Sequence, residues 1–508
     1  MENNNSYEKF LTCIKQKLAR QQVYVECSTN IDADAQIAKV LSVDASVCMA
    51  QTECLNGEAV ANGIITINML YSTEAEEIGV SSYSTNFNTK IQHSQITPNC
   101  NIMLCANVEE VVVNSLSAQS AKISCNITID GVVNKNQEIQ YVCVEKQGVY
   151  TKPTETTAMY VGDYKTTKWS ETQQCAIKQP IQKLLSSTNQ VICKGWEVSY
   201  NVLTIEGQIF NKIIYLTDEE TPKLMTVYNT YDFKQDIEFD NLSKDAMAEI
   251  NVCVVQQDAK CVVDEKNNQT TLELEIPLQA NICVYENKTI STVSDLFSIS
   301  NDVFVTNEGY SNCIMQKPEF FEKKIETNVS LTENEPRIDK LLAVTYTQMQ
   351  IVSDYIKDEQ IVVEAIIKAN LIYLNDEENK IYSVDIETPI ILTTNTEIDK
   401  NAQIEVFATL CDVDIMVKKG RDVYVDAVVK VFANVHVCQS CAVISEVSYG
   451  DAIQTNTAGI EIYFAKAGDD VWDIAKQLKV NPELIEKQNQ EIIFPLEKDE
   501  NISVYYQP

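Results

Sequence analysis

Side chains that commonly carry out catalysis are scarce in this 508-residue chain. It has two histidines, His93 and His436, and neither lies in an HExxH motif or a triad-like sequence context. Its 13 glycines never form G-x-G, and it contains no GxxxxGK[ST] motif, so the usual nucleotide-binding loops are missing. The 73 Asp and Glu residues are too numerous for any one pair to stand out as catalytic. We therefore expect a protein that is not an enzyme and uses no cofactor.

One short segment has donor atoms suited to a metal ion. His436, Cys438 and Cys441 offer three soft ligands within six residues. Structural zinc sites usually take four ligands, often as two separated pairs, and the chain has no second CxxC. In the repeat described below, His436 corresponds to Cys143 and Cys283, which indicates an inward-facing strand position. We interpret the segment as structural and predict no metal site, with zinc as the alternative.

The chain has 17 cysteines, many of them inside apolar triplets such as Val142-Cys143-Val144 and Val252-Cys253-Val254. In a reducing compartment such cysteines act as small hydrophobic residues. Late oxidative cross-linking of a mature assembly is the alternative.

The net charge is strongly negative, at 40 − 73 = −33. Such a surface repels phosphate backbones and anionic lipids, so we expect neither nucleic acid binding nor membrane insertion. No stretch approaches the roughly 18 consecutive apolar residues of a membrane-spanning helix. The first residues, Met1–Ser6, have no basic and apolar leader pattern, so we expect the protein to stay in the cytoplasm where it is made.

A strand-like segment that ends in tyrosine occurs three times. The copies are Gly63–Tyr71, Gly207–Tyr215 and Ala365–Tyr373, each about thirty residues after the triplets Lys39-Val40-Leu41, Lys183-Leu184-Leu185 and Lys340-Leu341-Leu342. They are offset by 215 − 71 = 144 and 373 − 215 = 158 residues, which is the size of one domain. Apolar residues alternate within each copy, as in a strand with one core face. The small residue that opens each copy indicates close packing or a bulge.

An acidic turn and a β-rich second half follow each tyrosine. The turns are Thr73–Glu77, Thr217–Glu220 and Asn375–Glu378. We interpret them as solvated hairpin tips, with a cation or partner site as the alternative. The second halves are Ile102–Val113 with Ala121–Val144, Ala248–Val263 with Thr270–Tyr285, and Ala402–Val417 with Asp422–Val437. Val, Ile and Thr dominate these segments, which favours strands.

We therefore predict a mainly β protein of three tandem, sandwich-like domains followed by a small βααβ domain. The predicted boundaries are residues 1–165 for the N-terminal segment and first repeat, 166–320 and 321–457 for the next two repeats, and 458–508 for the last domain. The N-terminal segment has a stripe at helical spacing, made of Tyr7, Phe10, Leu11, Ile14 and Leu18. It predicts a short helix that packs on the first domain or docks elsewhere.

The last fifty residues have a clear βααβ pattern. A β run ends at Lys466, and a helix carrying Trp472 and Ile474 follows the turn at Gly468. Asp469 or Asp470 can cap this helix. Asn481 can cap a second helix, with Pro482 at its first position, where a missing N–H costs nothing.

This pattern resembles the LysM family, whose members are best known for binding N-acetylglucosamine polymers. The segment Ala35–Val43, followed by the strand that ends at Tyr71, resembles the SPOCS domain of endospore-forming Firmicutes. Extended lead-ins precede the repeats at Val23–Cys27, Glu171–Ile177 and Lys323–Leu331. Several SPOCS copies followed by a LysM module are similar to clostridial coat-morphogenesis proteins. The resemblance implies a sporulation scaffold at the forespore surface, docked on a coat base-layer protein of the SpoIVA type.

In LysM modules the ligand lies between the first strand–helix loop and the loop after the second helix. The resemblance therefore places the partner or glycan groove at Gly468, Asp469, Asp470, Trp472, Asn489, Gln490 and Ile492. Asp470 stands where threonine is frequent, and Glu497–Glu500 replace the usual Pro-Gly. The added acid favours a basic protein surface over a neutral glycan. Our first hypothesis is thus protein docking, peptidoglycan binding is the alternative, and self-association is open.

Overall fold

The computed structural model describes residues 5–30, 36–177, 179–255, 258–264, 269–378, 380–453 and 459–506, and of residues 5, 30, 258–264, 269 and 270 only the backbone. The first residue of the SPOCS-like pattern, Ala35, and the predicted boundary at 457/458 lie outside these ranges. The described chain is mainly β, as the sequence predicted. Among the described residues, no helix is long and apolar enough to cross a membrane.

Each repeat contains a three-stranded antiparallel sheet with the tyrosine-ending segment at its centre. The sheets are β3 (Ile37–Cys54), β4 (Glu58–Thr73) and β5 (Ile78–Gln92); β9 (Ile181–Ser199), β10 (Val202–Thr217) and β11 (Leu224–Glu238); and β17 (Lys340–Lys357), β18 (Gln360–Asn375) and β19 (Lys380–Thr393). Ile65, Ile67 and Met69 of β4 are buried, which confirms the predicted period-2 face.

A four-stranded sheet built on one long strand completes each repeat. The long strands are β7 (Ser120–Val144), β14 (Gln269–Ser298) and β21 (Asp422–Ala452). Their partners are β1 (Asn5–Lys17), β2 (Gln21–Asn30) and β6 (Asn101–Ser117); β8 (Val149–Ile177), β12 (Met247–Val254) and β13 (Asp258–Asp264); and β15 (Asn301–Met315), β16 (Glu319–Ser330) and β20 (Ala402–Lys418). The two sheets of each repeat share one apolar core. The predicted boundaries at 165/166 and 320/321 fall inside β8 and β16.

The small residue that opens each tyrosine-ending segment makes room for the opposite strand. Gly63 faces Phe87 and Gly207 faces Phe233 in the cross-strand register. A Cβ atom at either glycine would lie 2.4 or 2.3 Å from the phenylalanine ring. In the third repeat Ala365 faces the slimmer Ile390. On the other side, the pairing with the preceding strand shifts register beside this residue in all three repeats, so the position combines close packing with a bulge.

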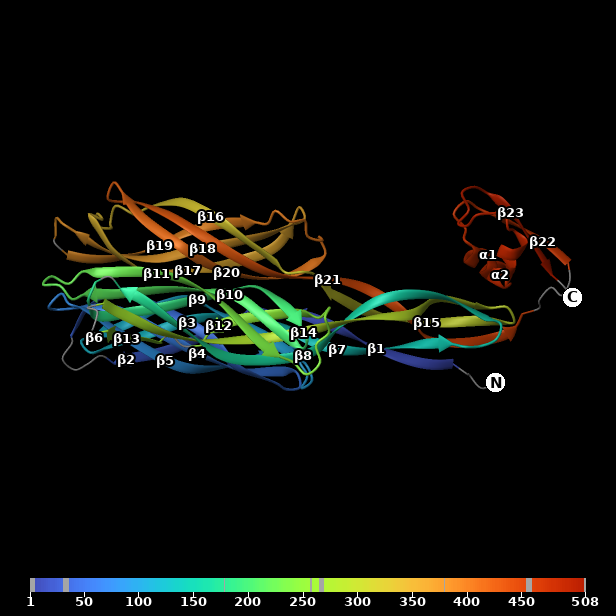
Figure 1. Ribbon diagram of the computed structural model, residues 1–508, viewed down its shortest axis with the longest axis horizontal. Coiled ribbons are helices and arrows are strands. Elements are labelled where there is room, and N and C mark those ends of the chain that lie inside the picture. The colour runs from blue at the N-terminus through green and yellow to red at the C-terminus, as the bar shows by residue number, and fades with distance from the viewer. Residues whose placement is uncertain are drawn as a thin grey trace.

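The long strands leave the three packed sandwiches, here called the head, and form an arm of three ribbons (Figure 1). In the arm β1 pairs with β7, β8 with β14, and β15 with β21. Side-chain amides join neighbouring ribbons: Asn136 exchanges two 2.8 Å hydrogen bonds with the backbone of Val161, and Asn312 donates to Thr157 O at 2.7 Å. The ribbons therefore hold one another through backbone groups as well as apolar packing.

The N-terminal segment is a strand, so the predicted helix is wrong. β1 pairs with β7 from Asn5↔Val144 to Lys17↔Val132, which provides backbone hydrogen-bond partners along its whole length. Phe10, Thr12 and Lys15 are buried in the arm, while Tyr7 and Leu11 are exposed. The helical spacing of these apolar residues does not decide the conformation of the segment. Pairing does, because β7 extends beyond the first sandwich and offers a long edge to β1.

The last described residues form a compact module with the order β22 (Gly459–Ala465), α1 (Val471–Leu478), α2 (Pro482–Gln488) and β23 (Glu500–Tyr506). We call it the terminal module. Asp470 caps α1 by accepting from Asp473 N, and Asn481 caps α2 by accepting from Glu483 N, as the sequence predicted. Figure 1 places the module at the end of the arm, away from the head.

Candidate functional site

Equivalent residues of the three repeats meet at one end of the head. The cluster contains the buried residues Leu41, Leu70, Leu185, Ile214 and Ile372, and the partly buried Leu342 packs against them. Three of these are the leucines of the repeated triplets, and the others immediately precede the three tyrosines. Identical positions of three repeats can contact one another only around a common axis. The repeats are therefore related by a pseudo-threefold axis, which continues into the three-ribbon arm.

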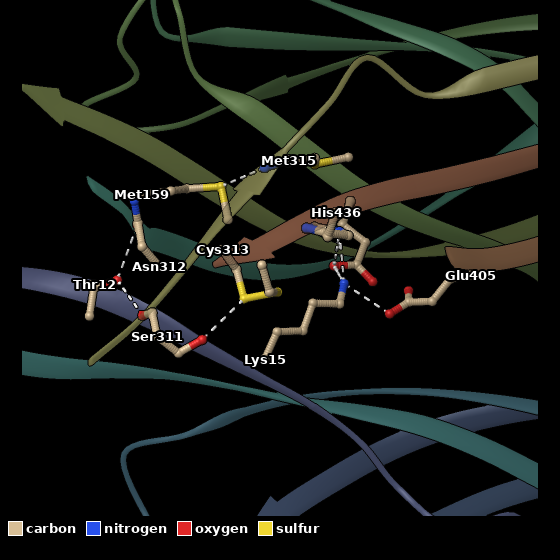
Figure 2. Close-up of a disulfide and its surroundings, with 11 residues drawn as sticks. Thr12, Lys15, Met159, Ser311, Asn312, Cys313, Met315, Glu405 and His436 are labelled. Carbon is tan, nitrogen blue, oxygen red and sulfur yellow. Dashed lines mark hydrogen bonds and ion pairs between the residues drawn. A yellow bond between two sulfur atoms is a disulfide. The ribbon is translucent and has the colours of Figure 1, made fainter. Parts of the chain in front are cut away.

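A buried ion cluster lies where this axis passes from the head into the arm. The ammonium group of Lys15 lies 2.7 Å from Glu249 Oε2, 2.8 Å from Glu405 Oε1 and 2.8 Å from His436 Nε2. Figure 2 shows Lys15 extending from β1 toward these groups. Tyr285 donates to the same oxygen of Glu249 at 2.6 Å. The ammonium group thus forms hydrogen bonds with Glu249 and His436 and an ion pair with Glu405, and all three of these groups belong to the second and third repeats.

Burial and neighbouring charges set the protonation of this cluster. Burial alone would lower the pKa of Lys15, but the carboxylates of Glu249 and Glu405 outweigh it and raise that pKa. Burial opposes ionisation of Glu249, yet Lys15 holds the pKa of Glu249 well below its usual range. Burial and the charge of Glu249 raise the pKa of Glu405 to about 8. Burial and Lys15 lower the pKa of His436 to about 3, so the imidazole is a neutral acceptor.

The register of the sheets corrects the predicted equivalence of His436. Val133, Val284 and Val435 face Ile102, Ala248 and Ile404 on the neighbouring strands. The next residues, Asn134, Tyr285 and His436, are spaced by 151 and 151 positions and are all fully buried. His436 therefore corresponds to Tyr285, not to Cys283, because bulges and loop lengths shift the copies. It does occupy an inward-facing strand position, as predicted.

The segment that offered metal-ligand types does not gather its ligands. Cys438 forms a disulfide with Cys313 on the neighbouring strand β15, and His436 accepts from Lys15. Among the described residues, no three His, Cys, Asp or Glu side chains are arranged to hold a metal ion. Most other described cysteines, including Cys13 and Cys283, are buried among apolar residues, as expected for small hydrophobic side chains. Nothing in the sequence pattern indicated the Cys313–Cys438 pairing.

A cavity of about 390 Å³ lies in the head between the three repeats. Glu249 and Glu405 contribute to its lining, and so do Asp44 and Lys212. Burial raises the pKa of Asp44 to about 6 and lowers the pKa of Lys212 to about 8. The centre of the head thus contains charged groups from all three repeats, rather than a continuous apolar core.

The terminal module brings some of the predicted groove residues to its surface and uses others internally. Gly468 has φ +97° in the turn before α1 and is exposed, as is Gln490, and Ile492 is half-buried. Asp469 accepts from Lys466 N at 2.9 Å, which fixes that turn. Asn489 is buried: it donates to Ile485 O and Ser503 O and accepts from Ser503 N. Its side chain therefore joins α2 to β23, with both N–H groups and one lone pair of its oxygen engaged.

Two further groove residues contact the arm. The tip of the β8–β14 ribbon presents Asp295, which accepts from Trp472 Nε1 at 2.8 Å and from Lys476 Nζ at 2.7 Å. Asp470 accepts from Lys152 of the same ribbon at 2.9 Å. Phe297, only 1% exposed, packs edge-on against Trp472 at 5.1 Å. We call this set of contacts the arm–module contact.

One face of the terminal module stays open. Ile460, Ile462 and Phe464 alternate along β22, with exposed fractions of 66, 55 and 75%. Tyr505, the cross-strand partner of Ile460, is also largely exposed. The opposite side of the same two strands carries the core residues of the module. Large apolar side chains gathered on one exposed face are typical of a contact surface.

Comparisons with known proteins identify the first repeat. Residues 36–116 match the family described as SipL, SPOCS domain. The match spans β3, β4, β5 and nearly all of β6, so it includes the three-stranded sheet of the first repeat and one strand of its four-stranded sheet. The chain thus carries a SPOCS domain, which relates it to sporulation. No curated protein and no solved structure matches the chain.

Proposed function

We propose that this protein is a non-enzymatic scaffold of spore envelope assembly, acting in the mother cell at the forespore surface. Its terminal module docks on a coat base-layer protein of the SpoIVA type. The SPOCS match supplies the link to sporulation. The observation that carries the docking role is the open apolar face of β22, made of Ile460, Ile462 and Phe464.

The architecture suits a spacer that joins two layers. In the head each sandwich has its own apolar core, and the three sandwiches meet in the Leu41 cluster and the ion cluster. In the arm, amide bridges join neighbouring ribbons. Because the module lies at the far end of the arm, its open face is separated from the surface of the head (Figure 1). A rigid element with a contact face at one end can hold two partners at a set distance.

The open face suits a protein more than a glycan. Sugar polymers are usually held by hydrogen-bonding groups and stacked rings, whereas this face is largely aliphatic, with Phe464 and Tyr505 as its exposed rings. Apolar residues of this kind form the buried centre of protein–protein contacts. In the predicted groove, Trp472 and Asp470 are already engaged by the arm.

The test is a fluorescent fusion of the full chain in sporulating cells, compared with the double variant Ile462→Glu/Phe464→Glu. We expect a shell around the forespore for the native chain and diffuse fluorescence for the variant. Ile391→Glu is the matched control, because Ile391 of β19 is 68% exposed but lies in the head. This control should still form the shell. Uniform staining of the vegetative wall, with pelleting by purified peptidoglycan, would instead support the glycan-binding alternative.

A further inference from the structure

We propose that the side of the terminal module formed by Trp472, Lys476 and Lys479 is a receptor for acidic–aromatic protein segments. In this chain its resident occupant is Asp295-Leu296-Phe297 at the tip of β14. The proposal rests on the proposed docking role of the module and specifies the chemistry of a partner that would use its second face.

The carboxylate of Asp295 accepts hydrogen bonds from two side chains of the terminal module, as a bound anionic ligand would. Oδ2 accepts from the indole N–H of Trp472 at 2.8 Å, and both oxygens lie 2.7 Å from the ammonium of Lys476. Burial would raise the pKa of Asp295, but the hydrogen bonds from Lys476 and Trp472 outweigh it and lower that pKa. Hydrogen bonds between charged groups are roughly twice as strong as neutral ones. The receptor therefore selects an anionic side chain at this position.

The phenyl ring of Phe297 fills the apolar part of the same receptor. It is 1% exposed and belongs to the core cluster of the module, beside Ile474 and Ala475 of α1. Trp472 packs against its edge, and the ammonium of Lys479 lies 6.0 Å from its centre. A buried aromatic anchor of this kind often dominates the energy of an interface.

The spacing of the two anchors defines the recognised segment. Residues i and i+2 of a strand point to the same side, so Asp295 and Phe297 both face the module. Leu296 points the other way and is buried in an apolar cluster of the arm. The receptor therefore recognises an extended segment with a carboxylate and an aromatic ring two residues apart, flanking a residue that it does not contact.

An external segment must displace the resident one. A tethered contact benefits from an effective concentration in the millimolar range, so a weak free peptide will not compete with it. Releasing the tip of β14 frees Trp472 and Lys476 together. The arm–module contact therefore makes this face available only to a partner of matching chemistry.

The experiment uses the full chain labelled with 5-fluorotryptophan. The chain has three tryptophans, so three ¹⁹F resonances are expected, and Trp472→Phe assigns one of them. The double variant Asp295→Asn/Phe297→Ala should shift the Trp472 resonance and leave those of Trp169 and Trp196 in place. The control Asp302→Asn/Phe304→Ala removes the same D-x-F spacing from β15, where Phe304 is 63% exposed, and should shift none.

Two peptides are then added to the opened double variant. A peptide with the sequence of residues 292–299 should return the Trp472 resonance toward its native position, with saturation. The same peptide with Asn and Ala in place of Asp295 and Phe297 should bind at least roughly tenfold more weakly. Lys476→Met introduced into the opened variant should weaken the first peptide by a similar factor.

Three results would overturn the proposal. One is a Trp472 resonance that does not move when Asp295 and Phe297 are replaced. Another is equal binding of the two peptides, and the third is a response to an N-acetylglucosamine oligomer with none to either peptide. These outcomes are independent of the forespore shell, which tests the proposed function. A normal shell with a failed peptide test would reject the receptor and leave the scaffold role in place.

Discussion

The ammonium of Lys15 and the carboxylate of Glu249 form a 2.7 Å ion pair with both side chains nearly free of solvent contact, although 234 positions separate them in the chain. Lys15 lies on the first strand, and Glu249 belongs to the second repeat. Glu405 of the third repeat completes the cluster. One side chain thus joins the N-terminal strand to both other repeats.

Replacing Lys15 with methionine should destabilise the head strongly. The change leaves the carboxylate of Glu249 buried without its cation, and breaking a buried pair in this way typically costs about 3–5 kcal/mol. Differential scanning calorimetry should show Tm lowered by several degrees. Lys9→Met is the matched control, because Lys9 is on the same strand and its pair with Glu138 is exposed, so its effect should stay within about 1 kcal/mol. A Tm for Lys15→Met as close to native as the control would contradict this role.

Glu405 should make the head less stable as the pH rises. Its pKa is about 8 in the folded chain and 4.5 as the ordinary value. A folded-state pKa above the unfolded one means that the folded chain holds the proton more tightly. The contribution of Glu405 to the free energy of unfolding is therefore complete below about pH 4.5 and is lost as the pH rises toward 8. The Tm difference between the native chain and Glu405→Gln should change across this range, and a constant difference would refute the assignment.

Gly63→Ala and Gly207→Ala should each destabilise the fold. A methyl group at these positions meets the rings of Phe87 and Phe233, and overpacking of this kind costs about 1–3 kcal/mol. Gly309→Ala in β15 is the control, since the nearest atom to its added Cβ lies 3.9 Å away. The free energy of unfolding measured in urea should be near the native value for the control. Equal losses of this free energy at all three sites would instead indicate a general effect of strand glycines.

The two phenylalanines of the module region should respond differently to substitution. Phe464 is 75% exposed, so Phe464→Lys should change stability by less than about 0.5 kcal/mol. Phe297 is buried between arm and module, and Phe297→Ala should weaken their contact by about 3–5 kcal/mol. The hydrogen-exchange rate of the α1 amides measures the strength of this contact. The rate should increase in Phe297→Ala and stay at the native value in Phe464→Lys. Equal protection in both variants would contradict the packing described here.

Much of the fold could be predicted because its information is local. Alternation at Ile65, Ile67 and Met69 gave the strand and its buried face, and the caps at Asp470 and Asn481 gave both helix starts. The N-terminal stripe misled, since a short pattern with helical spacing cannot reveal that a distant strand will offer it a pairing edge.

The residues predicted to form one groove have different roles in the structure, and the sequence could not show this because the contacts that decide it are long-range. The sequence supplied Trp472 and Asp470 as surface candidates, but it could not show that Asp295 and Lys152 would contact them. Asn489 likewise matched a motif, while its structural use depends on Ser503, which pairs with it only in the folded module.

By itself the sequence determined the strand content, the threefold repetition and the βααβ order of the last residues, because periodicity, capping and spacing act over a few positions. Only the tertiary structure decided that the repeats surround one axis, that Lys15 contacts both other repeats, and that the module rests against the arm. These relationships join residues hundreds of positions apart. They depend on shape and charge complementarity between finished surfaces, which no local pattern encodes.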